Sequence, residues 1–415
     1  MDRRHFLASS GASLAGVSLG LQGTPRPARA QTSNSSDVLV IGAGTFGVWT
    51  AYHLSRLGAS VTLVDAYGPG NSRASSGGET RQMQADTRSD LYTRSSIDSY
   101  GWWKRLERES GISIVLETGK VDLSLSAEDR DVGEEVAGRH QRFGIEGTEI
   151  LEPDEVRYRW PQMHSDDASW GIYSEGAAGC VMMARKGVAV VAEQLQQQGG
   201  QVRTSHVRPR LTSTGAVEGV TTQDGETLSA GHYVFACGPW LSTLFPDLLG
   251  PRLQVQRRDV LFFGSPPGDS RFAYPHMPTW FVRGSGFYGF PDIEARGFKV
   301  APYPDYNVID PDVDERLIMP HQVRRGRQFL AHRFPGLADM PISETRVCQV
   351  TNTSDRDFMA DVHPESDNVW IVGGGSGHGF KHGPAVGEHL ANRIIGGEVR
   401  DDYLEAFTVL KDEFA

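Results

Sequence analysis

Apolar residues follow two patterns along this chain, and each pattern predicts a different kind of sheet. Short continuous apolar runs, typical of buried parallel strands, occur at residues 38–41, 61–65, 232–238 and 368–372. Segments with helical periodicity occur at residues 48–57, 187–198 and 385–395. We expect these strands and helices to build one parallel sheet with helices packed on it.

The long segments between these runs have a different pattern. Residues 121–178 and 253–344 are richer in proline, aromatic residues and alternating apolar and polar positions, which is typical of antiparallel sheets. We therefore predict two interleaved domains. An α/β domain comprises residues 36–120, 179–252 and 345–415, and a mainly antiparallel domain comprises residues 121–178 and 253–344. A length of 415 residues also favours two domains over one simple core.

A glycine-rich motif follows the first predicted strand. It reads Gly42-Ala43-Gly44-Thr45-Phe46-Gly47, and the second predicted strand ends in Asp65. In a strand–turn–helix–strand unit, such glycines let the backbone approach a pyrophosphate, and the acid accepts a hydrogen bond from a ribose hydroxyl. We predict that Gly42, Gly44, Thr45, Phe46, Gly47 and Asp65 bind a dinucleotide. The motif does not distinguish NAD from FAD.

The net charge and the N-terminus narrow the functional classes. A formal net charge of -11, with no apolar stretch long enough to span a bilayer, predicts neither a nucleic-acid partner nor membrane insertion of the mature chain. Residues 1–30 contain paired arginines at positions 3 and 4, an apolar stretch and the triplet Ala28-Arg29-Ala30. This order is typical of an export signal and resembles the twin-arginine type. We expect a periplasmic or secreted protein that is exported after folding.

A second glycine-rich run lies near the C-terminus, downstream of Cys348. It reads Gly373-Gly374-Gly375-Ser376-Gly377-His378-Gly379-Phe380-Lys381. Taken alone, the run could be an ordinary strand-to-helix turn and Cys348 a small buried hydrophobe. The chain has 3 cysteines, which indicates no disulfide framework, and no Cys/His cluster has metal-ligand spacing. We predict no metal site.

The order of these motifs resembles the D-amino-acid-oxidase-like FAD-dependent oxidoreductases, and within them the monomeric sarcosine oxidase and N-methyl-tryptophan oxidase group. The resemblance extends over residues 38–397. It implies a Rossmann-like FAD-binding domain interleaved with a mainly antiparallel β-sheet substrate domain, so the predicted fold class is α/β plus antiparallel β. FAD is the implied cofactor, and we expect a monomer.

The resemblance assigns cofactor contacts to single residues. Cys348 matches a cysteine that forms a thioether with the flavin, so covalent FAD is expected. Backbone N–H groups of Gly375, Ser376, Gly377 and His378 are expected to face the flavin ring, where they would stabilise negative charge. The other implied contacts are Ser75, Ser76, Arg81, Val207, Gly379, Phe380 and Lys381.

The resemblance also implies catalytic residues. Lys299 matches a lysine that activates O₂, because a fixed cation stabilises the charge of superoxide in a dry site. Arg81 matches an arginine that faces the flavin, Lys381 a lysine that holds the substrate carboxylate, and Tyr303 stands near an active-site histidine of the group. Without the resemblance, a lysine on a strand is more often a solvated charge, and Ser75, Ser76 and Arg81 could form an N-capped loop with a surface arginine.

Three positions depart from the group and affect the expected substrate. Gly77 stands in place of a histidine, Gln84 in place of an arginine that helps to hold the carboxylate, and Val350 in place of a tyrosine. We expect a roomier, less polar pocket that accepts a bulkier amine than sarcosine.

The predicted function is an exported FAD-dependent amine oxidase that acts on a secondary or tertiary amine or an N-alkyl amino acid. It would transfer hydride to the flavin and reduce O₂ to H₂O₂. The alternatives are a dehydrogenase that passes electrons to a quinone or redox protein, and a flavin-binding protein without turnover. An NAD-dependent dehydrogenase is disfavoured, since it needs neither the Cys348 segment nor the second glycine run.

Overall fold

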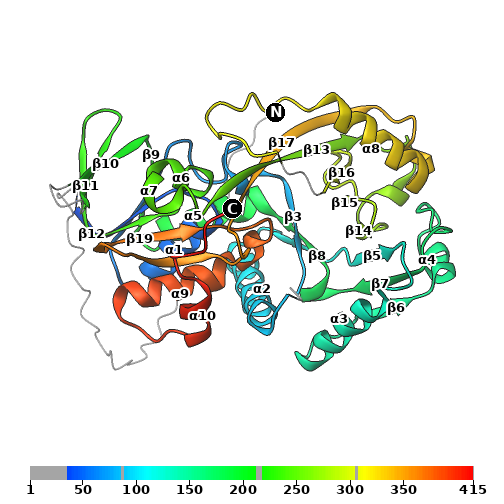
Figure 1. Ribbon diagram of the computed structural model, residues 1–415, viewed down its shortest axis with the longest axis horizontal. Helices are drawn as coiled ribbons and strands as arrows, with labels where there is room; N and C mark the ends of the chain where they lie inside the picture. The colour runs from blue at the N-terminus through cyan, green and yellow to red at the C-terminus, as the bar shows by residue number, and fades with distance from the viewer. Residues whose placement is uncertain (1–34, 86–87, 212–216, 304–306, 415) are drawn as a thin grey trace, which may run out of the picture. The chain divides into compact units, whose positions relative to one another are not determined.

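The computed structural model describes residues 35–85, 88–211, 217–303 and 307–414. The predicted export signal, residues 1–30, lies outside this part of the chain. Within the described residues, the helices are too short or too polar to cross a lipid bilayer. The chain from Ser35 to Ala415 forms one compact unit, and its elements belong to three sheets and the helices packed on them (Figure 1).

The first sheet has a parallel centre. Its strands are β1 (Ser35–Ile41), β2 (Val61–Asp65), β9 (Gln201–Thr204), β10 (Val207–Leu211), β11 (Val217–Thr222), β12 (Thr227–Phe235), β18 (Met359–His363) and β19 (Ser366–Gly373). The strands β19, β12, β1, β2 and β9 are neighbours in that order and run parallel. The sequence of β1 is apolar throughout its second half because both faces are covered: Val38 and Val40 pack into one core, and Leu39 and Ile41 into another.

Four long helices contribute to the core on one face of this sheet, together with Tyr403 of the short helix α10 (Asp401–Ala406). They are α1 (Thr45–Arg56), α2 (Asp90–Ser110), α5 (Ala184–Gln197) and α9 (Gly383–Ile395). Helix α9 lies directly against α1 because Gly387 has no side chain: a Cβ there would come within 2.7 Å of the Thr50 nitrogen. The indole rings of Trp49 and Trp103 join α1 to α2 edge to face, with centroids 4.9 Å apart.

The second sheet is mainly antiparallel. Its strands, in spatial order, are β17 (Ile342–Asn352), β13 (Gln254–Phe263), β16 (Phe298–Pro302), β15 (Phe287–Phe290), β14 (Thr279–Arg283), β5 (Lys120–Ser124), β7 (Trp170–Ser174) and β6 (Glu149–Leu151). Every neighbouring pair is antiparallel except β14 and β5. Helix α8 (Pro320–Arg333) packs on one face of this sheet, where Phe329 and Leu330 join its apolar core.

The remaining elements are short. A three-stranded sheet consists of β3 (Thr80–Met83), β8 (Cys180–Met183) and β4 (Val115–Leu116). The other helices are α3 (Arg130–Arg142), α4 (Pro153–Arg159), α6 (Leu241–Leu244), α7 (Pro246–Leu249) and α10 (Asp401–Ala406).

The predicted fold class is confirmed, because a Rossmann-like parallel sheet and a mainly antiparallel sheet alternate along the chain. One predicted boundary needs correction. The division between residues 344 and 345 falls inside β17, which pairs with β13 from Ile342 to Asn352 (Figure 1). Cys348 therefore belongs to the second sheet, where it lies opposite Arg258.

Candidate active site

A cavity of about 800 Å³ lies between the carboxyl ends of the parallel strands and one face of the second sheet. Of the site residues predicted from the sequence, all except Gly47 line it: Gly42, Gly44, Thr45, Phe46, Asp65, Ser75, Ser76, Arg81, Val207, Lys299, Tyr303, Cys348, Gly375, Ser376, Gly377, His378, Gly379, Phe380 and Lys381. The fold thus brings residues from both sheets and from both glycine-rich runs to one site.

The turn between β1 and α1 forms one end of the cavity. Gly42 has φ +105°, and a Cβ there would lie 2.4 Å from the Ala236 carbonyl oxygen, so a side chain does not fit. Helix α1 has no acidic residue in its first turn and no side-chain cap at Gly44. The N–H of Thr45 donates to Ser76 Oγ at 3.0 Å. The positive end of the helix dipole therefore meets the cavity, as an anionic phosphate requires.

Asp65 and Gly47 have separate roles around this turn. The Asp65 carboxylate accepts from the N–H groups of Ala43 and Tyr67, each at 2.8 Å, and so orders the turn. A carboxylate has about four acceptor positions, which leaves capacity for a ribose hydroxyl. Gly47 lies beneath the turn, where a Cβ would come within 1.9 Å of the Gly42 carbonyl oxygen. Its role is the close packing of α1 rather than contact with a ligand.

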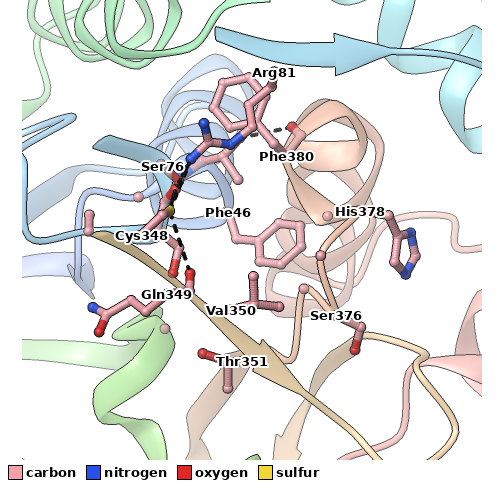
Figure 2. A pocket seen from close by; sticks show the side chains of 18 of the residues that line it. Phe46, Ser76, Arg81, Cys348, Gln349, Val350, Thr351, Ser376, His378 and Phe380 are labelled. Carbon is pink, nitrogen blue, oxygen red and sulfur yellow. Dashed lines mark hydrogen bonds between the residues drawn. The ribbon is translucent and has the colours of Figure 1, made fainter. Parts of the chain in front are cut away.

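Arg81 and Cys348 lie side by side in the cavity wall (Figure 2). Nη2 of Arg81 is 3.5 Å from Sγ of Cys348 and also donates to the Ser75 carbonyl, while Nη1 donates to the Thr80 carbonyl at 2.8 Å. These backbone contacts hold the guanidinium in place. A fixed positive charge therefore lies beside the only cysteine sulfur of the second sheet among the described residues.

Lys299 points from β16 into the same part of the cavity. The side chain is buried, and Nζ donates to Oγ1 and the carbonyl oxygen of Thr80 at 3.1 and 3.3 Å. Nζ also lies 4.4 Å from the ring centroid of Phe290. Burial, followed by the positive charge of Arg81, lowers the pKa of Lys299 to about 7. The amine therefore loses its proton far more readily than that of an exposed lysine.

The C-terminal glycine run forms a tight loop after β19, and it corrects one prediction. The N–H groups of Ser376 and His378 donate to the carbonyls of Thr351 and Gly375, both at 2.9 Å, so they do not face a flavin ring. Within the described chain, the N–H groups of Gly375 and Gly377 have no backbone acceptor. The imidazole of His378 stacks on Phe358, with centroids 4.5 Å apart, and points away from Cys348 (Figure 2).

The next residues connect this loop to the dinucleotide turn. Thr45 Oγ1 donates to the Phe380 carbonyl at 3.2 Å, and the Phe380 ring stacks on Trp103. Lys381 is buried, lines the cavity and donates from Nζ to the His378 carbonyl at 3.4 Å. The two glycine-rich motifs, more than 330 residues apart in sequence, thus form one continuous wall.

One face of the second sheet supplies cavity residues that sequence reasoning missed. Side chains two positions apart share a face of a strand, and one such face bears these cavity-lining residues: Lys120, Asp122, Arg258, Val260, Phe281, Arg283, Tyr288 and Phe290. Their alternate neighbours, Val121, Leu123, Trp280 and Val282 among them, pack in the apolar core under α8. Tyr303 lies on the cavity side, 5.8 Å from the guanidinium of Arg258. The alternation of cavity-facing and core-facing positions along these strands is the sequence signal that could have identified these cavity-lining residues.

Of the three positions at which this chain departs from the sarcosine oxidase group, two line the cavity and one does not. Val350 and Gln84 line the cavity. Gly77 does not widen it, so that prediction was wrong: a Cβ at Gly77 would lie 1.8 Å from the Asn71 carbonyl oxygen. Its own carbonyl accepts from Arg346 at 2.7 Å and from Arg185 at 3.0 Å. Gly77 is needed for the close approach of two backbone segments.

The cavity fits a flavin dinucleotide. Its walls include buried polar atoms without a protein partner among the described residues, namely Ser75 Oγ, Gln82 Nε2 and Thr351 Oγ1. Buried polar atoms are normally satisfied, so these three indicate positions at which a polar ligand or water binds. Three features match the parts of FAD: a helix N-terminus without an acidic residue in its first turn suits a phosphate, a carboxylate suits a ribose, and a wall of mixed aromatic and cationic residues suits the flavin ring.

Comparison with known proteins identifies the family. The model of the FAD-dependent oxidoreductases (DAO) matches residues 37–393. The chain belongs to this family. Monomeric sarcosine oxidase from Bacillus sp. (strain B-0618) is 30% identical over 381 residues, which cover 89% of this chain and 95% of that protein. N-methyl-L-tryptophan oxidase from Escherichia coli O127:H6 is 26% identical over 367 residues, with coverages of 86% and 94%. This FAD-dependent oxidoreductase is therefore of the sarcosine oxidase type.

Solved structures agree with this family in fold. L-proline dehydrogenase from P. horikoshii has a TM-score of 0.76 at 20% identity, covering 88% of this FAD-dependent oxidoreductase and 95% of that chain. Fructosamine oxidase (Amadoriase II) from Aspergillus fumigatus also has a TM-score of 0.76, at 23% identity, with coverages of 91% and 90%. At these identities the likeness establishes the fold alone.

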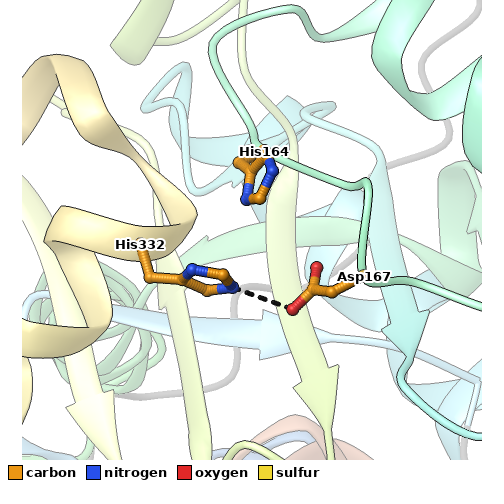
Figure 3. A group of neighbouring side chains, drawn as sticks. All are labelled: His164, Asp167 and His332. Carbon is orange, nitrogen blue, oxygen red and sulfur yellow. Dashed lines mark hydrogen bonds and ion pairs between the residues drawn. The ribbon is translucent and has the colours of Figure 1, made fainter.

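A group of metal-ligating residue types lies outside the cavity, although the sequence predicted no metal site. His164, Asp167 and His332 place one ligand atom each within 4.8 Å of one another (Figure 3). Asp167 accepts from His332 Nε2 at 2.8 Å and pairs with Arg333 at 2.9 Å. The carboxylate already neutralises a guanidinium, which makes it a poor ligand for a divalent cation. We infer that these three residues have a structural role and connect the end of α8 to the loop after α4.

Proposed function

We propose that this chain is an exported FAD-dependent amine oxidase acting on a C–N bond of a secondary or tertiary amine or an N-alkyl amino acid. The observation that carries the proposal is the convergence of Cys348, Arg81 and Lys299 in a cavity that includes a dinucleotide-binding turn. When bound, FAD would supply the acceptor for a hydride from the carbon next to the amine nitrogen. The net reaction converts amine, water and O₂ into the dealkylated amine, a carbonyl compound and H₂O₂.

The protein contributes orientation and charge. Lys381, buried in the cavity wall, binds an oxygen of the substrate, and Gln84 offers a neutral amide to the same space. Val350 and the aromatic rings of Tyr288 and Phe290 exclude water from the amine. A neutral amine gives up hydride more readily than an ammonium ion, so a wall with more cations than anions favours the reactive form of the substrate. Positioning of this kind accounts for catalysis without a nucleophilic side chain.

Cys348 is the attachment point for the flavin in this proposal. The Cys348 thiol would hold the flavin through a thioether bond, and O₂ would take up the two protons and two electrons released when this bond forms, giving H₂O₂. Arg81, held by the carbonyls of Ser75 and Thr80, stabilises the negative charge that develops at this place. Attachment prevents loss of the cofactor after export.

The first experiment is denaturation of the purified protein in acid, followed by measurement of the flavin that stays with the polypeptide. We expect bound flavin in the parent protein and none in Cys348→Ala. Cys237→Ala is the matched control, because Cys237 lines the same cavity but burial, followed by the charge of Asp65, raises the pKa of its thiol to about 12. Flavin that washes off the parent chain would refute covalent attachment. Absence of any flavin would refute the proposed function as a whole.

A further inference from the structure

A second polar cluster lies in the cavity wall on the strands β5, β7 and β14. In the sheet, β14 is two strands and β5 three strands away from β16, which carries Lys299. Neighbouring strands are about 4.8 Å apart, so the cluster is roughly 10–14 Å from the Lys299 strand. It is therefore a distinct region of the same cavity.

Asp122 and Arg283 form the centre of this cluster. Asp122 is 7% exposed, and its Oδ2 pairs with Lys120 Nζ at 2.5 Å. Its Oδ1 is buried and has no partner among the described residues. In the parallel pairing of β5 and β14, Asp122 lies opposite Phe281, and Arg283 is the next residue on the same face. Arg283 Nε is also buried without a partner in the described part of the chain.

His140 fixes one side of the cluster. The imidazole is 3% exposed, and Nδ1 lies 2.9 Å from Thr148 Oγ1. Thr148 in turn donates to Ser174 Oγ at 3.3 Å, and Ser174 lies opposite Lys120 in the sheet. Burial lowers the pKa of His140, so the ring is neutral at neutral pH. The cluster thus combines two cations, Lys120 and Arg283, with one anion, Asp122.

These contacts define what the cluster can bind. One net positive charge and an unpaired guanidinium nitrogen suit a carboxylate. The unpaired Oδ1 of Asp122 suits an N–H or O–H donor next to that carboxylate. The C-terminal residue of a peptide has both groups: a carboxylate and, two bonds away, an amide N–H.

We propose that Asp122 and Arg283 form a distal subsite for the C-terminal residue of an N-alkylated short peptide, whose N-terminal amine is oxidised at the flavin end of the cavity. The inference rests on the proposed function and names its substrate class. An extended chain spans about 3.3–3.6 Å per residue, so about three residues cover the distance from the Lys299 strand to the cluster. Lys381 then holds the first peptide carbonyl instead of an α-carboxylate.

The test uses the flavin-loaded full-length protein and measures peroxide release. The probes are sarcosyl-glycyl-glycine and its C-terminal amide, which differ only in the distal charge. We expect kcat/KM to be at least about tenfold higher for the carboxylate form, mainly through a lower KM, because charge-assisted hydrogen bonds exceed neutral ones. Arg283→Gln should reduce this ratio to near one. Arg271→Gln, an exposed arginine paired with Asp269, should keep the parent ratio.

Asp122 is tested with the peptide whose last amide N–H is replaced by an ester oxygen. The parent protein should have about tenfold lower kcat/KM for the ester than for the all-amide peptide. In Asp122→Asn this loss should be smaller, because the side-chain amide can turn an N–H donor toward the ester oxygen. Equal rates for acid, amide and ester in the parent would overturn the subsite. So would an unchanged acid-to-amide ratio in Arg283→Gln.

A binding measurement separates failure of the subsite from failure of the proposed function. Acetyl-glycyl-glycine has no oxidisable amine, and its Kd can be measured by equilibrium dialysis whether or not the protein turns over amines. Tighter binding of this peptide than of its amide, lost in Arg283→Gln, would support the subsite even if no amine is oxidised. Failure to bind, with turnover of simple N-methyl amines intact, would refute the subsite alone.

Discussion

At the scale of one residue, Lys299 has the most strongly shifted pKa among the residues that take part in the proposed chemistry. Its pKa of about 7 lies far below the usual value for lysine, so the folded protein holds the cation below pH 7 and loses it as the pH rises through 7. If the cation stabilises charge on O₂, the rate of flavin reoxidation by O₂ should fall as the pH rises above about 7. Lys299→Met should slow reoxidation by about 10²–10³, the usual effect of removing one such group, and should make it independent of pH over this range. Stopped-flow measurement of reoxidation at a series of pH values checks both effects.

The same variant distinguishes an oxidase from a dehydrogenase. In an oxidase, Lys299→Met should slow the reaction with O₂ far more than the anaerobic reduction of the flavin by substrate. Equal slowing of both half-reactions would contradict a role in oxygen activation. Fast reoxidation of the parent protein by a soluble quinone, combined with slow reaction with O₂, would favour the dehydrogenase alternative.

At the scale of an element, the position of α1 depends on glycines that allow close backbone contact. A Cβ at Gly47 would meet the Gly42 carbonyl oxygen at 1.9 Å, and backbone atoms cannot move away as a flexible side chain can. Gly47→Ala should therefore destabilise the protein by about 1–3 kcal/mol or more and reduce its flavin content, because the dinucleotide turn is displaced. Thermal unfolding and the ratio of flavin to protein absorbance measure the two effects.

A matched glycine provides the control. Gly101 lies in the middle of α2, and a Cβ there would meet no atom within 4 Å. Gly101→Ala should stabilise the protein by about 0.5–1 kcal/mol, because alanine loses less conformational entropy in a helix. A similar loss of stability in both variants would contradict a specific role for the backbone contact beneath the dinucleotide turn.

The helices and strands also show how much of the fold can be predicted from the sequence. The helix predicted at residues 187–198 is α5 (Ala184–Gln197), and the strand predicted at 368–372 is β19 (Ser366–Gly373), because periodicity and terminating glycines are local signals. The distal cluster was missed, since it depends on the register of β5 against β14, strands about 160 residues apart in sequence. The error at Gly77 has a different cause: the local fold of its own loop places the Asn71 carbonyl oxygen against it, and a comparison of residue types does not show this contact.

At the scale of the whole molecule, the cavity wall is assembled from segments that are distant in the chain. The dinucleotide turn, β3, β16, β17 and the C-terminal glycine loop all contribute to it. A chain that has not folded therefore has no flavin site, and the proposed covalent attachment through Cys348 would require the complete fold. If residues 1–30 direct twin-arginine export, the flavin should be acquired before the protein crosses the membrane.

Expression in a bacterial host with this pathway tests the order of events. We expect flavin-loaded mature protein in the periplasmic fraction, and flavin-loaded precursor in the cytoplasm when both Arg3 and Arg4 are replaced by lysine. In-gel flavin fluorescence of the two fractions measures location and attachment together. A Cys348→Ala protein is the control, because it should still be exported but lose its fluorescence on denaturation. Precursor that is exported equally well with both lysines would contradict the twin-arginine route, and cytoplasmic precursor without flavin would place attachment after export.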